Sequence, residues 1–181
     1  MDANADLPSG PKNRFRDAHR NPDFTIDQDW ASYTAAEHDR WNRLFRRSHA
    51  VLQNRACDEF LAMIDVLSLS EGGIPEMEKL SDRLESITGW RVVPVIELVP
   101  DDVFFNQLAN RRFPAGAFIR PEEELDYLQE PDIFHDIFGH VPLLANPVYA
   151  ELPTARADSE RCNSASWQIW HGFIGTRSSS V

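Results

Sequence analysis

The chain has 181 residues, 42% of them hydrophobic and 26% charged, which is typical of a single globular domain. Its net charge of −11 argues against nucleic acid or an anionic membrane as a partner. No apolar run approaches the roughly 20 residues of a membrane span, and the N-terminus lacks a signal-peptide core. Two cysteines, Cys57 and Cys162, are too few for a disulfide scaffold, so we expect a cytoplasmic protein; no oligomer is implied.

The predicted elements begin after a loose arm. Residues 1–25 carry little apolar content, and we expect them to be disordered. Apolar residues at helical spacing predict one helix over residues 34–52 and a second over 56–67. Pro75 opens a third predicted helix, which ends near residue 89.

The middle of the chain predicts a small sheet among further helices. Residues 91–98 predict a short strand, in which Pro94 suggests an edge position. A helix over 101–109 and an extended piece over 115–119 follow, and a last helix begins at Pro131. The predicted fold is therefore mainly α with a small β-sheet. The acidic run over 122–124 is interpreted as a solvated surface.

The segment 131–142, P-D-I-F-H-D-I-F-G-H-V-P, predicts a metal site. His135 and His140 offer two imidazoles, and Asp132 and Asp136 offer acceptors that can fix their tautomers. Neutral imidazole with carboxylate suits Fe(II), Zn(II) or Mn(II). A spacing of five places the rings off a common helix face, so we expect different rotamers or a distortion, which we place at Gly139. The alternative is two buried histidines that hydrogen-bond to the two aspartates.

The stretch 129–142 resembles the iron-binding motif of the pterin-dependent aromatic amino acid hydroxylases, and most closely that of the bacterial phenylalanine hydroxylases. The string Y-T-A-A-E-H-D-R-W over 33–41 resembles the opening helix of their catalytic domain. The stretch from Thr88 to Arg120, which begins T-G-W-R, resembles the middle of that domain. The resemblance implies the hydroxylase catalytic-domain fold, with residues 26–150 as its N-terminal portion and the C-terminus incomplete.

The resemblance also implies a function, phenylalanine 4-monooxygenase activity. Fe(2+) and tetrahydrobiopterin, or a related tetrahydropterin, would convert L-phenylalanine and O2 to L-tyrosine. It assigns roles to eight residues: iron ligands His135 and His140; pterin contacts Phe104, Val99 and Asp136; and substrate contacts Arg120, Pro131 and Asp132. Three positions depart from the family pattern, namely Glu97, Pro114 and Leu128.

The third iron ligand of the family is a glutamate in a helix of pattern L-Y-W-Y-T-V-E-F-G-L, which residues 151–181 do not spell. If the last base of each codon is read with the first two of the next, residues 167–181 can encode A-N-L-A-R-L-Y-W-Y-T-V-E-F-G. Our hypothesis is a frameshift near Glu151, which leaves residues 151–181 as an out-of-frame, disordered tail without the carboxylate ligand.

Three alternatives to an active phenylalanine hydroxylase remain open. The chain could be a truncated, catalytically dead protein, or it could belong to the tryptophan-type hydroxylases. It could also be an unrelated metallohydrolase that uses His135, His140 and a local carboxylate such as Glu151. With two ligands we expect weak iron binding; tight binding would implicate Glu151, Asp158 or Glu160 as the third ligand.

Overall fold

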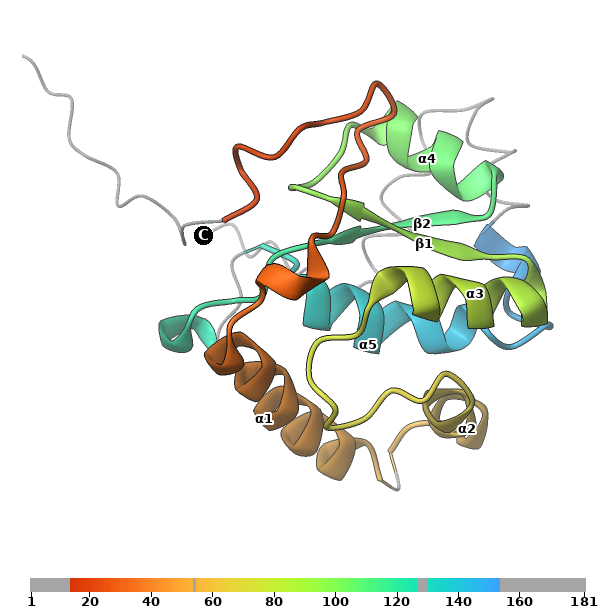
Figure 1. The fold of residues 1–181 in the computed structure, drawn as a ribbon. Helices are drawn as coiled ribbons and strands as arrows, with labels where there is room; N and C mark the ends of the chain where they lie inside the picture. The colour runs from red at the N-terminus through yellow and green to blue at the C-terminus, as the bar shows by residue number, and fades with distance from the viewer. Residues whose placement is uncertain (1–13, 54, 127–129, 154–181) are drawn as a thin grey trace, which may run out of the picture.

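The computed structural model describes residues 14–53, 55–126 and 130–153 (Figure 1). Its elements in chain order are the 3-10 turn η1 (Trp30–Ser32), α1 (Ala35–Leu52), α2 (Asp58–Val66), α3 (Met77–Thr88), β1 (Arg91–Val95), α4 (Asp101–Ala109), β2 (Arg112–Gly116), the 3-10 turn η2 (Glu122–Glu124) and α5 (Ile133–Leu144). The prediction of a mainly α fold with a small sheet is confirmed.

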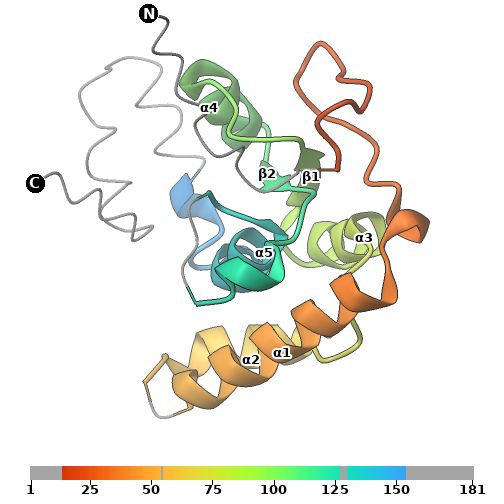
Figure 2. The same ribbon diagram turned by 90° about the vertical axis from the view of Figure 1, so that its left-hand side faces the viewer.

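The two strands form a parallel pair at the centre of the fold. Val92 lies opposite Phe113, and Val95 lies opposite Gly116. Parallel strands need a crossover connection, which α4 provides. In Figure 1, α4 covers one side of the sheet, while α3 and α5 lie on the other side, against β1 and β2 respectively. Figure 2 shows α1 and α2 beyond α5, where they form the outermost layer.

Aromatic packing joins α5 to the outer helices. The rings of Phe134 and Phe138 stack at a centroid distance of 4.9 Å. Trp41 of α1 meets Phe134 edge-on at 5.1 Å, and Phe45 meets Phe138 at 5.4 Å. From α2, Phe60 adds a further edge contact to Phe138 at 6.2 Å. Such pairs contribute beyond the area they bury, so α5 is the element on which the outer layer depends.

The strand boundaries differ from the sequence prediction. β1 ends at Val95 instead of residue 98, and Glu97 and Leu98 are exposed. β2 begins at Arg112 instead of residue 115. The cause is the register, which pairs five residues of each strand and no more. Pro94 lies at the outer edge as predicted: its carbonyl accepts a hydrogen bond from Ile26 N at 3.0 Å.

The described part of the predicted N-terminal arm, residues 14–25, is packed. The side chain of Phe15 is 5% exposed and its ring lies 5.6 Å from that of Tyr33. Thr25 is buried and forms an antiparallel bridge with Val95. The scarcity of apolar residues gave no sign of these contacts, and polar contacts also hold the segment, among them Arg112 to Asp23 at 3.0 Å. Among the described helices, none is long and apolar enough to cross a membrane.

A capping box starts α1. The Thr34 side chain accepts a hydrogen bond from Glu37 N, and the Glu37 carboxylate accepts one from Thr34 N at 2.7 Å. Arg14 donates to the same carboxylate at 2.7 Å. Although burial opposes the shift, the hydrogen bonds from Thr34 and Arg14 hold the pKa of Glu37 below its usual 4.5. The charged form of Glu37 therefore stabilises the folded chain.

We predict that Glu37→Gln lowers the free energy of unfolding by about 0.5–1 kcal/mol at pH 7. A depressed pKa contributes stability above the unfolded value, and that stability is lost as pH falls through the folded value. The difference between variant and parent should therefore shrink as pH falls below 4.5. Urea denaturation at several pH values measures it. Glu78→Gln, in the first turn of α3, is the matched control for removing a first-turn carboxylate, and it should lower the free energy of unfolding by less than Glu37→Gln does.

Candidate metal centre

Asp132 fixes the start of α5. Its side chain is fully buried, and its Oδ1 accepts a hydrogen bond from His135 N at 2.9 Å, which makes it the N-cap of the helix. An N-cap aspartate satisfies one of the free N–H groups of the first turn and places negative charge at the positive end of the helix dipole. Because His135 lies in that first turn, Asp132 sets the direction in which the imidazole leaves the helix.

Arg120 neutralises the buried Asp132. Its Nε donates to Oδ2 at 2.8 Å, its Nη2 donates to Oδ1 at 2.8 Å, and its backbone N–H donates to Oδ2 at 2.9 Å. A two-pronged contact of this kind is the geometry in which a guanidinium binds a carboxylate best. The resemblance assigned Arg120 to the substrate carboxylate; in this structure one fork of its guanidinium is already occupied by Asp132.

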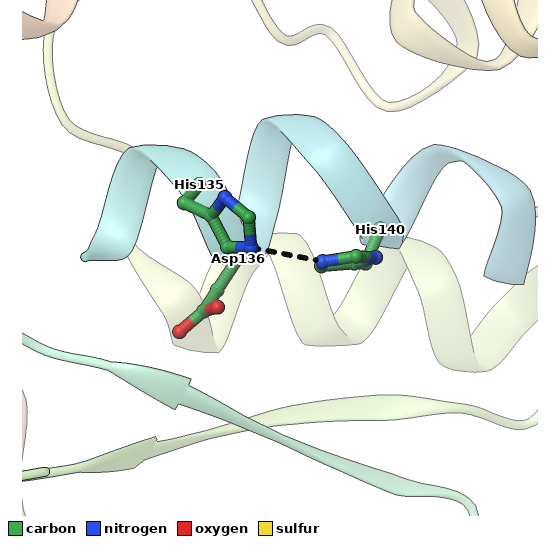
Figure 3. Close-up of side chains that lie close together, drawn as sticks. All are labelled: His135, Asp136 and His140. Carbon is green, nitrogen blue, oxygen red and sulfur yellow. Dashed lines mark hydrogen bonds between the residues drawn. The ribbon is translucent and has the colours of Figure 1, made fainter. Parts of the chain in front are cut away.

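His135 and His140 turn their rings toward each other. Their Nε2 atoms lie 3.3 Å apart, and Figure 3 shows both rings on one side of α5. The helix is regular α throughout, including Gly139, so the predicted distortion at Gly139 is wrong. Rotamers alone bring the two nitrogens together across the spacing of five. Two nitrogens this close can bind one ion as adjacent ligands.

Burial keeps both imidazoles neutral. It lowers the pKa of His135, and it lowers the pKa of His140 to about 4, to which the nearby His135 adds. A histidine must be neutral to bind a metal, so both rings are ready as ligands at neutral pH.

Asp136 completes a group of three residues whose ligand atoms lie within 4.8 Å of one another, His135, Asp136 and His140. Its Oδ2 accepts a hydrogen bond from the backbone N–H of Gly116 at 2.8 Å, at the end of β2. Burial raises the pKa of Asp136 to about 7. The sequence predicted that Asp132 and Asp136 accept hydrogen bonds from the imidazoles. Among the described residues, their partners are backbone N–H groups and Arg120 instead.

A cavity of about 260 Å³ lies beside His135. Its walls come from α1, from the segment after β2 and from α5: Leu44, Arg47, Ser48, Arg120, Leu125, Phe134, His135, Phe138 and Gly139. The size and the mixture of rings with two arginines suit a small molecule with an apolar body and an anionic group. The α1 wall and the Gly116 N–H donor were not predicted, because the sequence carries no motif for either.

The proposed pterin residues are not gathered at this cavity. Phe104 is half-buried on α4 and lies 5.7 Å from the ring of Phe105, while half-buried Val99 precedes α4. α4 lies on the opposite side of the sheet from α5 (Figure 1). Pro131 is half-buried immediately before the N-cap, Pro114 is buried in β2, and exposed Glu97 pairs with Arg20.

Glu151, considered as a replacement ligand, lies elsewhere. Its carboxylate accepts two hydrogen bonds from Arg111 at 2.8 Å, and it is not part of the group of three. Asp136 is therefore the carboxylate that accompanies the two histidines among the described residues. Leu128, Asp158 and Glu160 lie outside the described residues.

We predict that Asp132→Asn lowers the free energy of unfolding by about 3 kcal/mol or more. Asparagine still caps a helix well, so the loss arises from leaving the buried Arg120 without its partner. Chemical denaturation measures it. The matched control is Asp126→Asn at an exposed ion pair with Arg47, for which a loss of at most about 1 kcal/mol is expected. Equal losses in the two variants would contradict this account of Asp132.

We predict that Gly139→Ala raises the free energy of unfolding by about 0.5–1 kcal/mol. Gly139 is helical and exposed, and an added Cβ would meet nothing within 4 Å. Alanine then gains helix propensity without a clash. A thermal denaturation scan tests this, and a destabilised variant would show that the backbone at this position requires glycine.

The sequence matches a family profile and several known proteins. The sequence profile of the biopterin-dependent aromatic amino acid hydroxylases matches residues 22–155. A phenylalanine-4-hydroxylase of Caulobacter vibrioides is 57% identical over 140 residues, which cover 77% of this chain and 48% of the relative. One from Chromobacterium violaceum is 48% identical over 134 residues, covering 74% and 45%.

Solved structures of phenylalanine hydroxylase share the fold of this chain. The iron- and phenylalanine-bound phenylalanine hydroxylase of Chromobacterium violaceum has a TM-score of 0.77 at 41% identity, covering 84% of this chain and 55% of that one. The same enzyme with iron(III) and 7,8-dihydrobiopterin gives 0.78 at 43%, covering 84% and 57%. The chain spans about half the length of the curated relatives it matches. On the profile match and these identities, the chain belongs to the biopterin-dependent aromatic amino acid hydroxylases.

Proposed function

We propose that this chain carries the metal- and substrate-binding part of a phenylalanine 4-monooxygenase, which hydroxylates L-phenylalanine to L-tyrosine. The observation that carries the proposal is the convergence of two neutral imidazoles, His135 and His140, beside a cavity that also contains Arg120. Relatives named phenylalanine-4-hydroxylase share 40–57% of their residues with the matched part of this chain. Their solved structures include forms with iron, with phenylalanine and with dihydrobiopterin.

His135 and His140 would hold Fe(2+) as two of the three protein ligands, and the restored reading frame would supply the family glutamate as the third. Imidazole nitrogens with a carboxylate are the ligands of non-haem iron sites that keep positions open for dioxygen. Bound iron and a tetrahydropterin would supply the activation of O2 and the two electrons that hydroxylation of an aromatic ring requires.

The protein residues would position the amino acid and exclude water from the cavity. The part of the Arg120 guanidinium not used by Asp132 would bind the carboxylate of the amino acid, with Asp132 holding it in place and Pro131 forming a wall. Phe134 and Phe138 give the cavity its apolar surface. On the pterin side we assign Phe104 to stacking, Val99 to packing and Asp136 to polar contact.

The encoded reading frame is part of the proposal. The profile match ends at residue 155, close to the inferred frameshift near Glu151, and residues 151–181 would then be an out-of-frame tail. The chain as written would lack the family glutamate and bind iron weakly. We retain a cytoplasmic location as a proposal, supported by the free thiol of Cys57.

The decisive experiment supplies Fe(2+), a tetrahydropterin, O2 and L-phenylalanine to two proteins: this chain, and a version with the reading frame restored after Ala150. We expect tyrosine, quantified by chromatography, from the restored version and little or none from the chain as written. L-Tryptophan in parallel reactions separates the two hydroxylase types. Tyrosine from neither protein would refute the phenylalanine activity, and hydrolysis without pterin would favour a metallohydrolase.

In the restored protein, His135→Gln and His140→Gln should each lower turnover by more than the roughly 10–100-fold that loss of an outer hydrogen-bond partner costs at a metal site. Titration with Co(II), followed by its absorption, should show the same loss of metal affinity. His19→Gln, at an exposed position remote from α5 in sequence, is the control and should leave both readouts unchanged. Normal metal binding in either ligand variant would exclude that histidine as a ligand.

A further inference from the structure

The segment between Arg120 and Asp126 forms one wall of the cavity beside His135. Arg120 and Leu125 belong to this wall, and η2 lies between them. In Figure 1, η2 is the short teal turn close to α1. Hydrogen bonds inside the segment are local: Glu124 N donates to Pro121 O at 3.2 Å, and Leu125 N donates to Glu122 O at 3.4 Å. Such local bonds shape the turn but do not fix its distance from α1.

Two arginines of α1 provide that fixation. Arg43 donates to both carboxylate oxygens of Glu122, with Nη1 to Oε1 at 2.7 Å. One helical turn later, Arg47 pairs with Asp126. Arg47 also lines the cavity, so the same side chain contacts the empty space and the acidic segment. The acidic run is solvated at Glu122 and Glu123, as the sequence predicted, and Glu122 in addition pairs with a neighbouring helix.

We infer that Arg43 and Arg47 are positioning residues, which hold the segment 122–126 against α1 and thereby set the width of the cavity that receives the amino acid. The inference rests on the proposed function for the identity of the ligand. Exposed ion pairs are individually weak, but these two act on one short segment whose start is already fixed by the buried contact between Arg120 and Asp132. A segment held at both ends forms a rigid wall, and a rigid wall binds its ligand without paying for its own ordering.

The test compares the double variant Arg43→Gln/Arg47→Gln with a control that removes the same two charges elsewhere, Arg46→Gln/Arg16→Gln. Arg46 lies on the same helix but pairs with Glu71, and Arg16 is exposed near the N-terminus. Amide hydrogen exchange at Glu124 and Leu125 reports opening of the segment directly. We expect exchange there to be roughly three- to tenfold faster in the Arg43/Arg47 variant and unchanged in the control.

Two further measurements separate charge pairing from general loosening. Exchange in the parent protein should approach that of the variant in about 1 M salt, where exposed charges are screened. The single variant Glu122→Gln should also speed exchange, because it breaks the same pair from the side of the segment and leaves Arg43 paired with Asp39. Unchanged exchange in the Arg43/Arg47 variant or in Glu122→Gln would overturn the inference.

The link to the ligand is measured by titration calorimetry with L-phenylalanine in the frame-restored protein. The Arg43/Arg47 variant should bind it roughly three- to tenfold more weakly than the control variant does. Faster exchange with unchanged affinity would overturn the role in ligand positioning. If the parent protein does not bind L-phenylalanine at all, the proposed function fails, while the exchange data still decide whether the two arginines hold the segment.

Discussion

The buried contact between Arg120 and Asp132 is the constraint on which the site depends. Asp132 is simultaneously the N-cap of α5 and the acceptor for three donors of Arg120. One carboxylate therefore joins the chain leaving β2 to the helix that carries both histidines. A buried charge without this compensation would cost several kcal/mol, so the pair and the helix start must form together. The position of His135 follows, because its backbone N–H is the group that Asp132 caps.

A second constraint follows from placing the metal-binding residues on the helix at the centre of the core. α5 packs Phe134 and Phe138 against α1 and α2, and its other face approaches β2. The same burial that makes α5 the structural centre lowers the pKa of His140 and raises that of Asp136. Stability and chemistry are thus linked: the burial of this helix favours neutral imidazoles, the form that binds a metal.

Hydrophobic periodicity predicted the helices, because helix formation depends on residues that are close in the sequence. The helical pattern around Trp41 and Leu44 and the run before Gly89 gave α1 and α3 to within a few residues. The strand ends were wrong, since the register of β1 on β2 depends on a pairing between residues about twenty apart. The distortion at Gly139 was also wrong, because sequence spacing gives the position of a Cβ but not its rotamer. The motif over 131–142 located the two histidines and Asp136, whereas the donor to Asp136 could not be predicted, because the Gly116 N–H comes from a distant strand.

The pairing of the acidic run over 122–124 also depends on a contact between residues far apart in the sequence. A row of glutamates gives no sign in the sequence of which one faces solvent and which one faces a basic helix. Arg43 and Arg47 are four residues apart and so lie on one face of α1, and this face meets Glu122 and Asp126. The cavity wall is therefore held by contacts of unequal strength: a buried ion pair fixes its start, and exposed ion pairs fix its end.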